Sequence, residues 1–412
     1  MIKRWFSMFL PKGSNKLLFI SAALLALMGV VYHTSASMNT NTQMNDLILT
    51  ATKSLAFLVV SYWAMVRIAH IFSFRSFSKY NWLFIIITLL ALFAPRLWKA
   101  RNGAYNWIPV PGFGTIQPSE FAKIVVMLLL AQGFGVLPVA AWMKDKAQLK
   151  RLGFLEPIKR IWSVIWIPFT VSLLYFLIIL FVQKDLGSAM VIFFIAMVIT
   201  FMAVHPFLKN IQRILLAILL IGTAGIALLI SPLGVDLLYK IGLQEYQISR
   251  ITNLYNLFDT VNSYDTGFQQ VKGLLSFSHG GMFGVGLGKS INKYILPESQ
   301  TDYILAIIVE ESGFLAFIAI LVLYGIMIYV LLNYSMKVND ERGRLFLIGN
   351  AAYLFFHFVI NVGGVTVLIP LTGIPLLMLS QGGSSLLTIF ITLGISQNII
   401  ARYENSLVKG RR

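Results

Sequence analysis

Residues 244–313 read QEYQISRITNLYNLFDTVNSYDTGFQQVKGLLSFSHGGMFGVGLGKSINKYILPESQTDYILAIIVEESG and form the one long polar excursion in this chain. On both sides of it, apolar runs close to 20 residues long recur. Hydrophobic residues make up 58% of the 412 residues, and charged residues only 12%. Because about 20 residues of α-helix cross the hydrocarbon core of a bilayer, these runs predict transmembrane helices. The sequence therefore predicts an all-α, polytopic integral membrane protein.

Ten transmembrane spans are predicted, with the polar segment between the seventh and the eighth. Their expected ranges are 17–36, 49–72, 81–95, 120–141, 161–182, 188–205, 212–231, 301–334, 344–368 and 382–402. We expect one membrane domain over residues 17–402, flanked by short tails at 1–16 and 403–412. The loop at 232–300 is then the largest connection, and its apolar residues suggest short amphipathic pieces on the membrane surface.

Lysine and arginine residues mark every second loop. They precede the first span and follow the second, fourth, sixth, eighth and tenth, as Lys3, Arg4, Lys12, Lys16, Arg75, Lys79, Lys144, Lys146, Lys150, Arg151, Lys159, Arg160, Lys209, Arg213, Lys337, Arg342, Arg344, Lys409, Arg411 and Arg412. Such residues are retained in cytoplasmic loops, so we expect cytoplasmic termini and an extracytoplasmic 232–300 loop. This bias accounts for most of the net charge of +17, and no nucleic-acid partner is expected.

A few cations fall in loops where topology gives no reason to keep them. These are Arg96, Lys99 and Arg101 in the second outer loop, and Lys240, Arg250, Lys272, Lys289 and Lys293 in the long one. An anionic ligand at the outer face would explain them. The chain contains no cysteine, which excludes disulfides, thiolate metal sites and thiol nucleophiles. Its five histidines show no metal-ligand spacing and are interpreted as structural.

Two short motifs place charges at the start of spans. In IQPSEFAK, Ser119 suits a helix cap, while Glu120 and Lys123 lie three residues apart and can pair on one helix face. This pair is either a capping and interfacial ion pair or part of a site wall. In QKDLGSAM, at 183–190, Lys184 and Asp185 lie in an outer turn, for which a solvated turn is favoured over a site.

Three further segments combine glycines with buried or clustered polar residues. GGMFGVGLGKS at 280–290 resembles a phosphate-cradling loop only superficially, because no strand precedes it. LPESQTDYILAIIVEESGF opens a span with Asp302 and buries Glu310 and Glu311 further on, and such carboxylates need partners inside the bundle. GIPLLMLSQGGSS at 373–385 breaks regular structure between spans, which is tolerated where the backbone lines a cavity or is buried in protein.

Six blocks, in order, resemble the signatures of the SEDS family (shape, elongation, division and sporulation), which comprises proteins of the RodA, FtsW and SpoVE type. They are NGAYNWIPVPGFGTIQPSEFAK, QKDLGSAMVIFF, YQISRI, DTGFQQVKGLLSFSHGGMFGVGLGKS, YILPESQTDYILAIIVEESGF and IPLTGIPLLMLSQGGSSLL. The resemblance covers nearly the whole chain and is modestly closer to the FtsW and SpoVE branch. Three residues depart from the family pattern: Lys184 stands where proline is usual, Asn106 where arginine is common, and Gln381 where tyrosine is common.

The resemblance implies an enzyme of the bacterial plasma membrane. It would be a peptidoglycan glycosyltransferase that polymerises lipid II into glycan strands at the outer face, during division or elongation, releasing undecaprenyl diphosphate with inversion. The implied partners are lipid II, the nascent glycan, a class B penicillin-binding protein acting as transpeptidase, and other divisome or elongation proteins. No cofactor is firmly implied, although a divalent cation, Mg²⁺ or Mn²⁺, would suit the diphosphate.

In this family an aspartate of the long outer loop is proposed as catalytic base, between an Asn-Pro pair and a Gly-Tyr/Phe-Gln triplet. Here the pair reads Asn256-Leu257 and the triplet starts at Gly267, with an interval about two residues longer than usual. Counting from Asn256 points to Asp259, whereas counting back from Gly267 lands nearest Asn262, with Asp265 three residues on. Asp259 is favoured, and Asp265 is kept as the alternative.

The chemistry requires a base for the attacking hydroxyl and positive charge on the departing diphosphate. The base is Asp259 or Asp265, and the expected diphosphate ligands are Arg250, Lys272, Lys289 and Arg101. The remaining residues expected to bind substrate or shape its cavity are Trp107, Gln117, Ser119, Glu120, Lys123, Asp185, Gln269, Asp302, Glu310, Ser380 and Ser384.

Two other functions remain open from the sequence. A flippase or other transporter of lipid-linked precursors would use buried charges such as Glu310 equally well, but it needs a polar path into the cytoplasmic half of the bundle. A non-catalytic scaffold for the transpeptidase needs neither buried charges nor a polar path through the bundle. The charged residues cluster toward the outer side, which favours the enzyme.

Overall fold

The computed structural model describes residues 9–38, 43–100, 103–110, 114–135, 166–204, 208–231 and 267–410, with a few single positions between 234 and 257. This part of the chain is almost entirely helical. Its α-helices are α2 (Lys16–Ala36), α3 (Met44–Ile71), α4 (Phe74–Phe93), α5 (Pro118–Gly135), α9 (Ile167–Leu177), α10 (Leu186–Met202), α11 (Leu208–Ile230), α15 (Phe268–Gly280), α16 (Ile304–Lys337), α17 (Glu341–Val365) and α18 (Gly383–Gly410).

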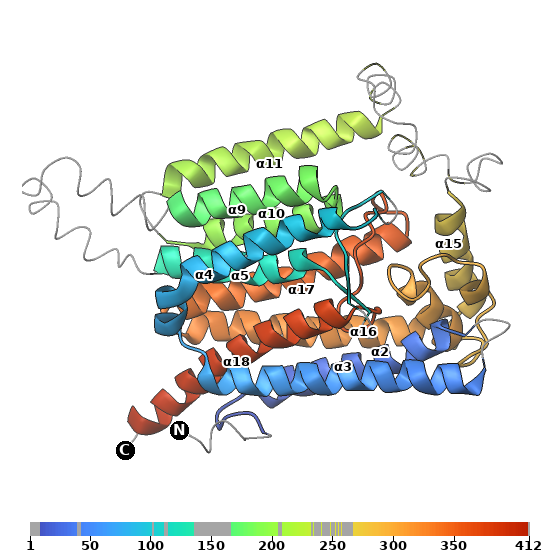
Figure 1. The fold of residues 1–412 in the computed structure, drawn as a ribbon, viewed down its shortest axis with the longest axis horizontal. Helices are drawn as coiled ribbons and strands as arrows, with labels where there is room; N and C mark the ends of the chain where they lie inside the picture. Colours follow the sequence, from blue (N-terminus) through green and yellow to red (C-terminus); the bar gives the residue numbers. More distant parts are fainter. Residues whose placement is uncertain are drawn as a thin grey trace, which may run out of the picture.

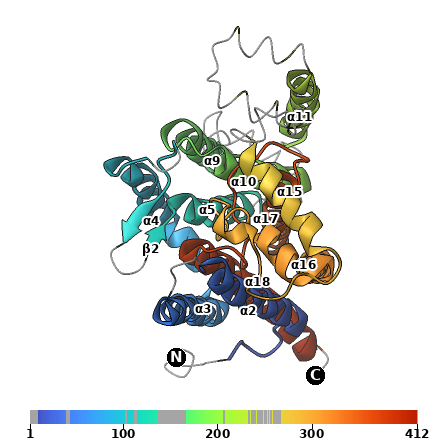
Figure 2. The ribbon, with the colours of Figure 1, turned by 90° about the vertical axis from the view of Figure 1, so that its right-hand side faces the viewer.

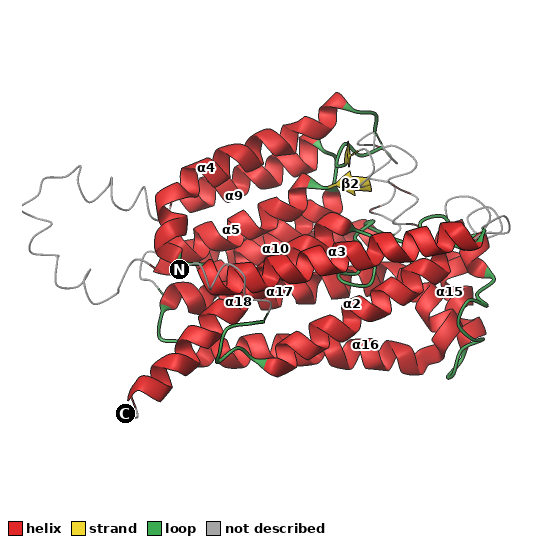
Figure 3. Ribbon diagram, turned by 60° about the horizontal axis from the view of Figure 1, so that its bottom comes forward, coloured by secondary structure: helices red, strands yellow, loops and turns green. Residues whose placement is uncertain are grey.

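Short elements complete the fold. Helix α4 continues into the 3₁₀ turn η1 (Ala94–Leu97), α9 into the π-helical turn η3 (Ile178–Val182), and η4 (Asn292–Tyr294) follows α15. The strands β1 (Ile108–Val110) and β2 (Gly114–Ile116) pair antiparallel, with Ile108 opposite Ile116. Figure 3 shows β2 at the end of the bundle that also carries α15.

Each of the ten predicted spans overlaps a helix, with shifted boundaries. Helix α3 begins at Met44 and α4 at Phe74, earlier than the predicted 49 and 81, and α18 continues to Gly410 instead of ending at 402. Within the described residues, six helices are long and apolar enough to cross a membrane, and two shorter apolar ones span Ile167–Val182 and Leu186–Met202. The multi-pass membrane class is confirmed, whereas the count of ten crossings and the orientation of the termini stay predictions.

The long helices run side by side as a bundle, and α15 stands across one end of it (Figure 1). Both termini lie near the opposite end (Figure 1). Helix α17 packs against α16, α5 and α10, while α18 packs mainly on α3. The view along the bundle shows α2, α3 and α18 grouped at one side and α11 at the other edge (Figure 2).

Burial separates central helices from peripheral ones. Every side chain of α5 from Ile124 to Ala131 is buried, as expected for a helix that is apolar all round and surrounded by protein. Helices α3, α4 and α11 instead expose large apolar side chains such as Val59, Leu90 and Ile221. An outward apolar face of this kind suits contact with lipid.

Helix α16 is broken at Gly313, which has φ 78° and ψ 179°. The glycine-rich loop after α15 closes this break: the amides of Val285 and Gly286 donate to the carbonyls of Glu310 and Glu311, and the Phe314 amide donates to the Gly281 carbonyl. A Cβ at Gly284 would lie 2.3 Å from the Glu311 carbonyl oxygen, so the close approach requires glycine. Gly284 therefore serves the packing of this loop against α16.

Helix α15 lies in the part of the loop where short amphipathic pieces at the membrane surface were expected, which stays a prediction. It packs against α16 through a face of small and polar residues, Gln270, Gly273, Ser276 and Gly280. A Cβ at Gly280 would lie 2.1 Å from the Val309 carbonyl oxygen, and one at Gly273 would meet the Tyr303 ring at 2.9 Å. Small residues permit this contact, so α15 is covered by protein on that side.

The two ends of the chain are tied together. The Asn15 amide donates to Oε1 of Gln397 at 2.8 Å, and Nε2 of Gln397 donates to the Asn15 carbonyl at 2.8 Å. Asn405 Nδ2 donates to the Lys12 carbonyl at 2.9 Å. These bonds hold α18 against the start of α2.

Candidate active site

A cavity of about 700 Å³ lies at the end of the bundle that carries α15. It is lined by α2, α3, the segment 104–115 around the β-hairpin, the turn 184–186 before α10, Gln269, residues 298–302 before α16, and the segment 371–383 before α18. Helices α2 and α3 each contribute one stripe with spacing i, i+3, i+4, i+7, which is one face of a helix. The stripes are Ala26, Gly29, Val30 and His33 on α2, and Thr50, Lys53, Ser54 and Phe57 on α3. We call these two stripes the α2–α3 wall.

Asp185 organises the turn before α10. It caps this helix by accepting from the Ser188 amide at 3.0 Å, and its Oδ2 accepts from Asn106 Nδ2 at 3.0 Å and from Gln117 Nε2 at 2.9 Å. The Ser384 hydroxyl oxygen accepts a hydrogen bond from the backbone amide of Gln117 at 3.3 Å. A carboxylate with three donors is held in one orientation, so Asp185 fixes the β-hairpin segment against α10.

The opposite wall consists of two irregular segments, 298–302 and 371–383, joined by hydrogen bonds. Asn361 Nδ2 donates to the carbonyls of Asp302 at 2.9 Å and Ile374 at 2.8 Å. The Ser380 hydroxyl donates to the Thr301 carbonyl at 2.6 Å and accepts from the Leu376 amide at 2.8 Å. We call these segments the pinned wall. The expectation that the break at 373–385 lines a cavity is confirmed for Gly373 to Gly383.

A fully buried polar network lies behind the pinned wall. Lys123 Nζ donates to Glu120 Oε1 at 2.6 Å and lies 2.9 Å from His357 Nε2, and the Tyr353 hydroxyl donates to Glu120 Oε2 at 2.8 Å. The other ring nitrogen of His357 lies 3.3 Å from the Pro375 carbonyl, which is part of the wall. The predicted pairing of Glu120 with Lys123 is confirmed. Its position is the core behind the cavity, because both side chains are at most 1% exposed.

Several residues with strained backbone conformations line the cavity. Among the described residues, four non-glycine residues have positive φ, and three of them line it: Lys184 at 57°, Glu298 at 57° and Met378 at 67°. Such conformations cost free energy and persist where the surrounding structure imposes them, often at functional sites. Proline, whose φ is fixed near −65°, could not adopt the conformation of Lys184.

A match to a family model shows which protein family the chain belongs to. The model of the FtsW/RodA/SpoVE family, described as cell cycle protein, matches residues 15–405. The chain belongs to this family. The SEDS resemblance expected from the sequence is thereby confirmed.

Two curated FtsW/RodA/SpoVE relatives cover most of the chain. It is 30% identical to the stage V sporulation protein E of Bacillus subtilis (strain 168) over 392 residues, covering 94% of this chain and 96% of that protein. It is 28% identical over 403 residues to the "probable peptidoglycan glycosyltransferase FtsW" of Wigglesworthia glossinidia brevipalpis, covering 92% of each.

Solved structures share the fold of this FtsW/RodA/SpoVE member. One, described as "Structural coordination of polymerization and crosslinking by a peptidoglycan synthase complex", matches with a TM-score of 0.67 and 23% identity, covering 95% of this chain and 98% of that one. The crystal structure of the rod shape determining protein RodA of Thermus thermophilus matches with a TM-score of 0.57 and 22% identity, covering 94% and 97%. The polytopic, all-α membrane fold agrees with both.

The structure brings together some of the residues that the sequence singled out. Five of them line the cavity: Trp107, Asp185, Gln269, Asp302 and Ser380. Gln117, Ser119 and Ser384 lie directly behind it, bonded to Asp185, Ser188 or each other. Four other predicted residues lie outside the described residues, so their roles stay predictions: Arg101, Arg250, Asp259 and Asp265.

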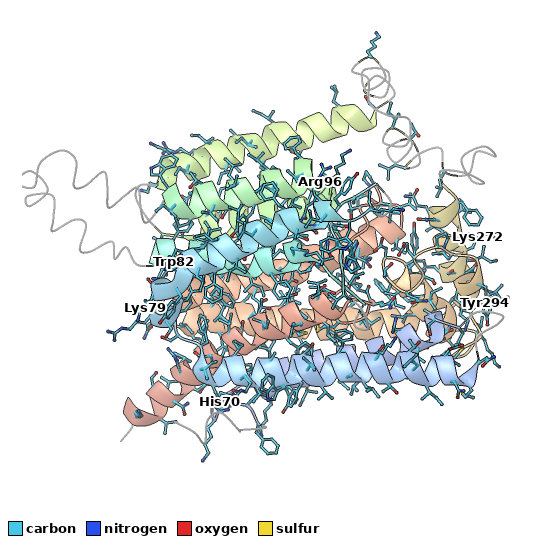
Figure 4. The ribbon with its side chains drawn as sticks, viewed as in Figure 1. His70, Lys79, Trp82, Arg96, Lys272 and Tyr294 are labelled. Atoms are coloured by element: carbon cyan, nitrogen blue, oxygen red, sulfur yellow. The ribbon has the colours of Figure 1, made fainter. Side chains whose placement is uncertain are left out.

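Three predicted substrate ligands are placed away from the cavity lining. Lys272 lies on α15 over the Phe268 ring at 5.6 Å, and Figure 4 shows it at the outer edge of the molecule. Lys289 is exposed in the glycine-rich loop. Glu310 accepts from Ser290, from Asn292 Nδ2 at 3.0 Å and pairs with His279 at 2.8 Å, so its carboxylate is used to hold that loop on α16.

Sequence reasoning missed several lining residues, chiefly His33, Lys53, Glu298 and Thr301. A signal for Lys53 was available, because it is a lysine inside a predicted span. The signal for His33 was absent, because one histidine in an apolar helix is usually structural. All three departures from the family pattern, Asn106, Lys184 and Gln381, also line the cavity.

A metal site in the cavity would need a cluster of protein ligands. Within the part of the chain that the structure describes, no three His, Cys, Asp or Glu side chains are placed to hold a metal ion. The described residues alone therefore do not make a metal site. A cation at this place would take ligands from the diphosphate oxygens themselves.

Proposed function

We propose that this protein is a peptidoglycan glycosyltransferase that polymerises lipid II at the outer face of the bacterial plasma membrane. The observation that carries the proposal is the polar cavity at one end of an apolar bundle, in a chain whose family includes proteins named as peptidoglycan glycosyltransferases. A cavity of about 700 Å³ can hold the head of a lipid-linked saccharide. The end that carries the cavity would face outward, as the lysine and arginine distribution predicts.

The reaction needs a base, an oriented acceptor and a stabilised leaving group. The 4-hydroxyl of one lipid-linked disaccharide attacks the anomeric carbon of another, the bond to the diphosphate breaks, and the hydroxyl proton passes to a carboxylate. The charge that develops on the diphosphate is stabilised by cations. Asp259, or Asp265 as the alternative, is the proposed base.

The described carboxylates of the cavity would serve a different task. Asp185 already accepts three hydrogen bonds, and Glu298 accepts from the Thr301 hydroxyl at 2.7 Å. Carboxylates held in this way are suited to accept hydrogen bonds from saccharide hydroxyl groups, because their orientation is fixed before the ligand arrives. Asp302, in the same wall, would extend this surface.

A flippase is less well supported than the enzyme. Beneath the pinned wall the described core is filled by the Glu120–Lys123 network and by buried apolar side chains of α5 and α17. A second hollow, of about 200 Å³, lies at Phe74, Asn398 and Arg402 and shares no lining residue with the cavity. An outward cavity closed at its base suits chemistry at one face.

Partners and a divalent cation belong to the same proposal. Polymerised strands must be crosslinked, so a class B penicillin-binding protein acting as transpeptidase is the proposed partner, within the division or elongation machinery. One structural neighbour comes from a complex described as coordinating polymerization and crosslinking, which supports this proposal. Mg²⁺ or Mn²⁺ would assist by bridging diphosphate oxygens.

The direct test is polymerisation of labelled lipid II by the purified protein, with and without its transpeptidase. Glycan strands should form and should depend on the loop carboxylate: Asp259→Asn should lower the rate about 100- to 10,000-fold with unchanged membrane levels. Asp265→Asn is the matched control. An inactive Asp265→Asn beside an active Asp259→Asn would move the base to residue 265, and activity in both variants would overturn the loop-aspartate mechanism.

A further inference from the structure

Two lysines line the cavity, Lys53 on α3 and Lys184 in the turn before α10. The side chain of neither lysine makes an ion pair or a hydrogen bond to another described residue. The basic residues that do pair lie elsewhere, as Lys123 with Glu120 and Lys293 with Glu311 do. The cavity therefore offers two ammonium groups that make no contact ion pair with a described residue, in a lining that also holds the carboxylates of Asp185, Glu298 and Asp302.

Both lysines occupy positions where a lysine is costly. Lys53 lies four residues after the start of the span predicted at 49–72, so it is about 6 Å along that span, where charged side chains are rare and mark functional sites. Lys184 has φ 57°, a conformation that glycine adopts without penalty but other residues do not. A ligand that uses the charges would account for lysine at both positions.

His33 adds a third group on the α2–α3 wall. Its side chain lines the cavity although the residue is only 7% exposed, and its Nδ1 lies 2.8 Å from the Ser54 hydroxyl. Its Nε2 is buried and has no hydrogen bond of normal geometry within the described residues, although the amides of Gln300 and Gln381 lie close to the ring. With Ser54 donating to Nδ1, the ring proton resides on Nε2, next to the side chains of Gln300 and Gln381.

Polarity changes with depth along the same wall. On α3 the lining residues run from Thr50 through Lys53 and Ser54 to Phe57, over about 10 Å of helix. On α2, which runs in the opposite direction, they run from His33 at the mouth to Val30 and Ala26 deeper in. Cationic and hydroxyl groups thus lie near the mouth, and apolar groups lie below them. This order fits an anionic amphiphile whose charged head lies near the mouth and whose first apolar units contact the deeper residues.

We propose that Lys53 and Lys184, beside His33, form the site that binds the diphosphate of a lipid-linked substrate, with its first isoprenoid units against Phe57 and Val30. The carboxylates Asp185, Glu298 and Asp302 are then left for saccharide hydroxyl groups. This assignment replaces Lys272 and Lys289, which lie outside the cavity lining. It rests on the proposed function for the identity of the substrate, but the site can be tested without turnover.

The experiment measures binding of farnesyl diphosphate to the full-length protein purified in neutral detergent. Lys53→Met removes the first charge, and Lys184→Gly removes the second in a residue that adopts φ 57° freely. Each change should raise the Kd by about 10- to 100-fold, because a charge-assisted contact to phosphate is lost. Lys53→Arg and Lys184→Arg should keep binding within a few-fold of wild type.

Lys79→Met is the matched control. Lys79 is an exposed lysine at the start of α4, at the opposite end of the bundle from α15 (Figure 4), and it lies over the Tyr80 ring at 5.2 Å. This variant loses the same charge and should bind like wild type. Thermal unfolding of every variant separates loss of the site from loss of the fold, and Lys53→Met removes a charge from an apolar helix, so it should fold at least as well as wild type.

Competition identifies the source of the anion. Inorganic pyrophosphate should compete at least tenfold more weakly than farnesyl diphosphate, and phosphatidylglycerol in the detergent micelle should not compete. Unchanged binding in both lysine variants, an equal loss in Lys79→Met, or equal competition by pyrophosphate or phosphatidylglycerol would each overturn the proposal. Polymerisation of lipid II is measured separately: wild type that binds farnesyl diphosphate without polymerising refutes the proposed function and leaves the site in place.

Discussion

The two walls of the cavity use their polar groups in opposite ways. On the pinned wall, Asn361 and Ser380 supply hydrogen bonds between segments that have no regular structure. On the α2–α3 wall the backbone is satisfied within helices, so its polar side chains are not needed for folding. Lys53 accordingly makes no ion pair with a described residue, and the His33 ring is bonded to Ser54 on the same wall. The difference suggests that one wall gives the cavity its shape and the other gives it affinity.

This comparison predicts that changes behind the pinned wall destabilise the fold. The largest effect is expected for Lys123→Met, which leaves the Glu120 carboxylate buried without its ion pair. Removing one partner of a buried pair costs about 3–5 kcal/mol. Thermal or denaturant unfolding in detergent measures this loss in the free energy of unfolding. The double variant Glu120→Gln/Lys123→Met should recover part of the loss, and a single variant as stable as wild type would show that the network does not support the wall.

The break in α16 offers a comparison within one helix. Gly313→Ala places a Cβ 2.2 Å from the Met282 carbonyl oxygen at a residue with φ 78°, so we expect a loss of at least about 1–3 kcal/mol. A Cβ at Gly325, in the same helix, would meet no atom within 4 Å, and Gly325→Ala should gain about 0.5–1 kcal/mol. Unfolding temperatures that shift in the same direction would contradict this interpretation of the break.

A smaller loss is expected for Asn361→Leu. This change removes the donor that joins the Asp302 and Ile374 carbonyls, which costs about 1–3 kcal/mol if both remain buried. Because the two segments carry Asp302 and Gly373 into the cavity, binding of saccharide-containing substrate should weaken as well. Limited proteolysis at 371–383 would report the loosened wall, and an unchanged cleavage pattern would show that Asn361 does not join the segments.

The smallest stability change is expected on the α2–α3 wall. Ser54→Ala removes the hydroxyl next to His33 Nδ1 and should alter the free energy of unfolding by less than about 1 kcal/mol. Binding of farnesyl diphosphate should nevertheless fall a few-fold, because the ring loses the partner that fixes its tautomer. A large loss of stability with unchanged binding would reverse the roles assigned to the two walls.

Much of the fold could be predicted from the sequence because hydrophobic length determines membrane helices. The ends of α3, α4 and α18 were missed, because amphipathic turns such as those near Met44 and Phe74 continue a helix beyond its apolar part. The role of Gly284 could not be foreseen either. Its close approach to Glu311 depends on a break in α16 that no local pattern indicates.

The site was predicted in part, for a similar reason. Asp185, Asp302 and Ser380 lie in irregular segments, where polar residues are conspicuous, and they do line the cavity. Lys272 and Lys289 were chosen by charge and loop position alone; Lys272 lies on α15 and Lys289 in the glycine-rich loop, and neither is part of the cavity lining. Lys53 and His33 lie inside apolar helices, and only the packing of α2 and α3 beside the other walls shows which helix face meets the cavity.

The contacts of α18 with α3 and with the start of α2 have a consequence for how the chain is synthesised. Helix α3 packs mainly on α18, where a Cβ at Gly394 would lie 2.6 Å from the Met65 carbonyl oxygen, and the Asn15–Gln397 bonds close the same junction. During synthesis the α2–α3 pair therefore lacks its contacts with α18 until nearly the whole chain has been inserted into the membrane. Before then the groove beside it is open to lipid, so a chain that stops short of α18 would present a half-formed cavity to quality-control proteases.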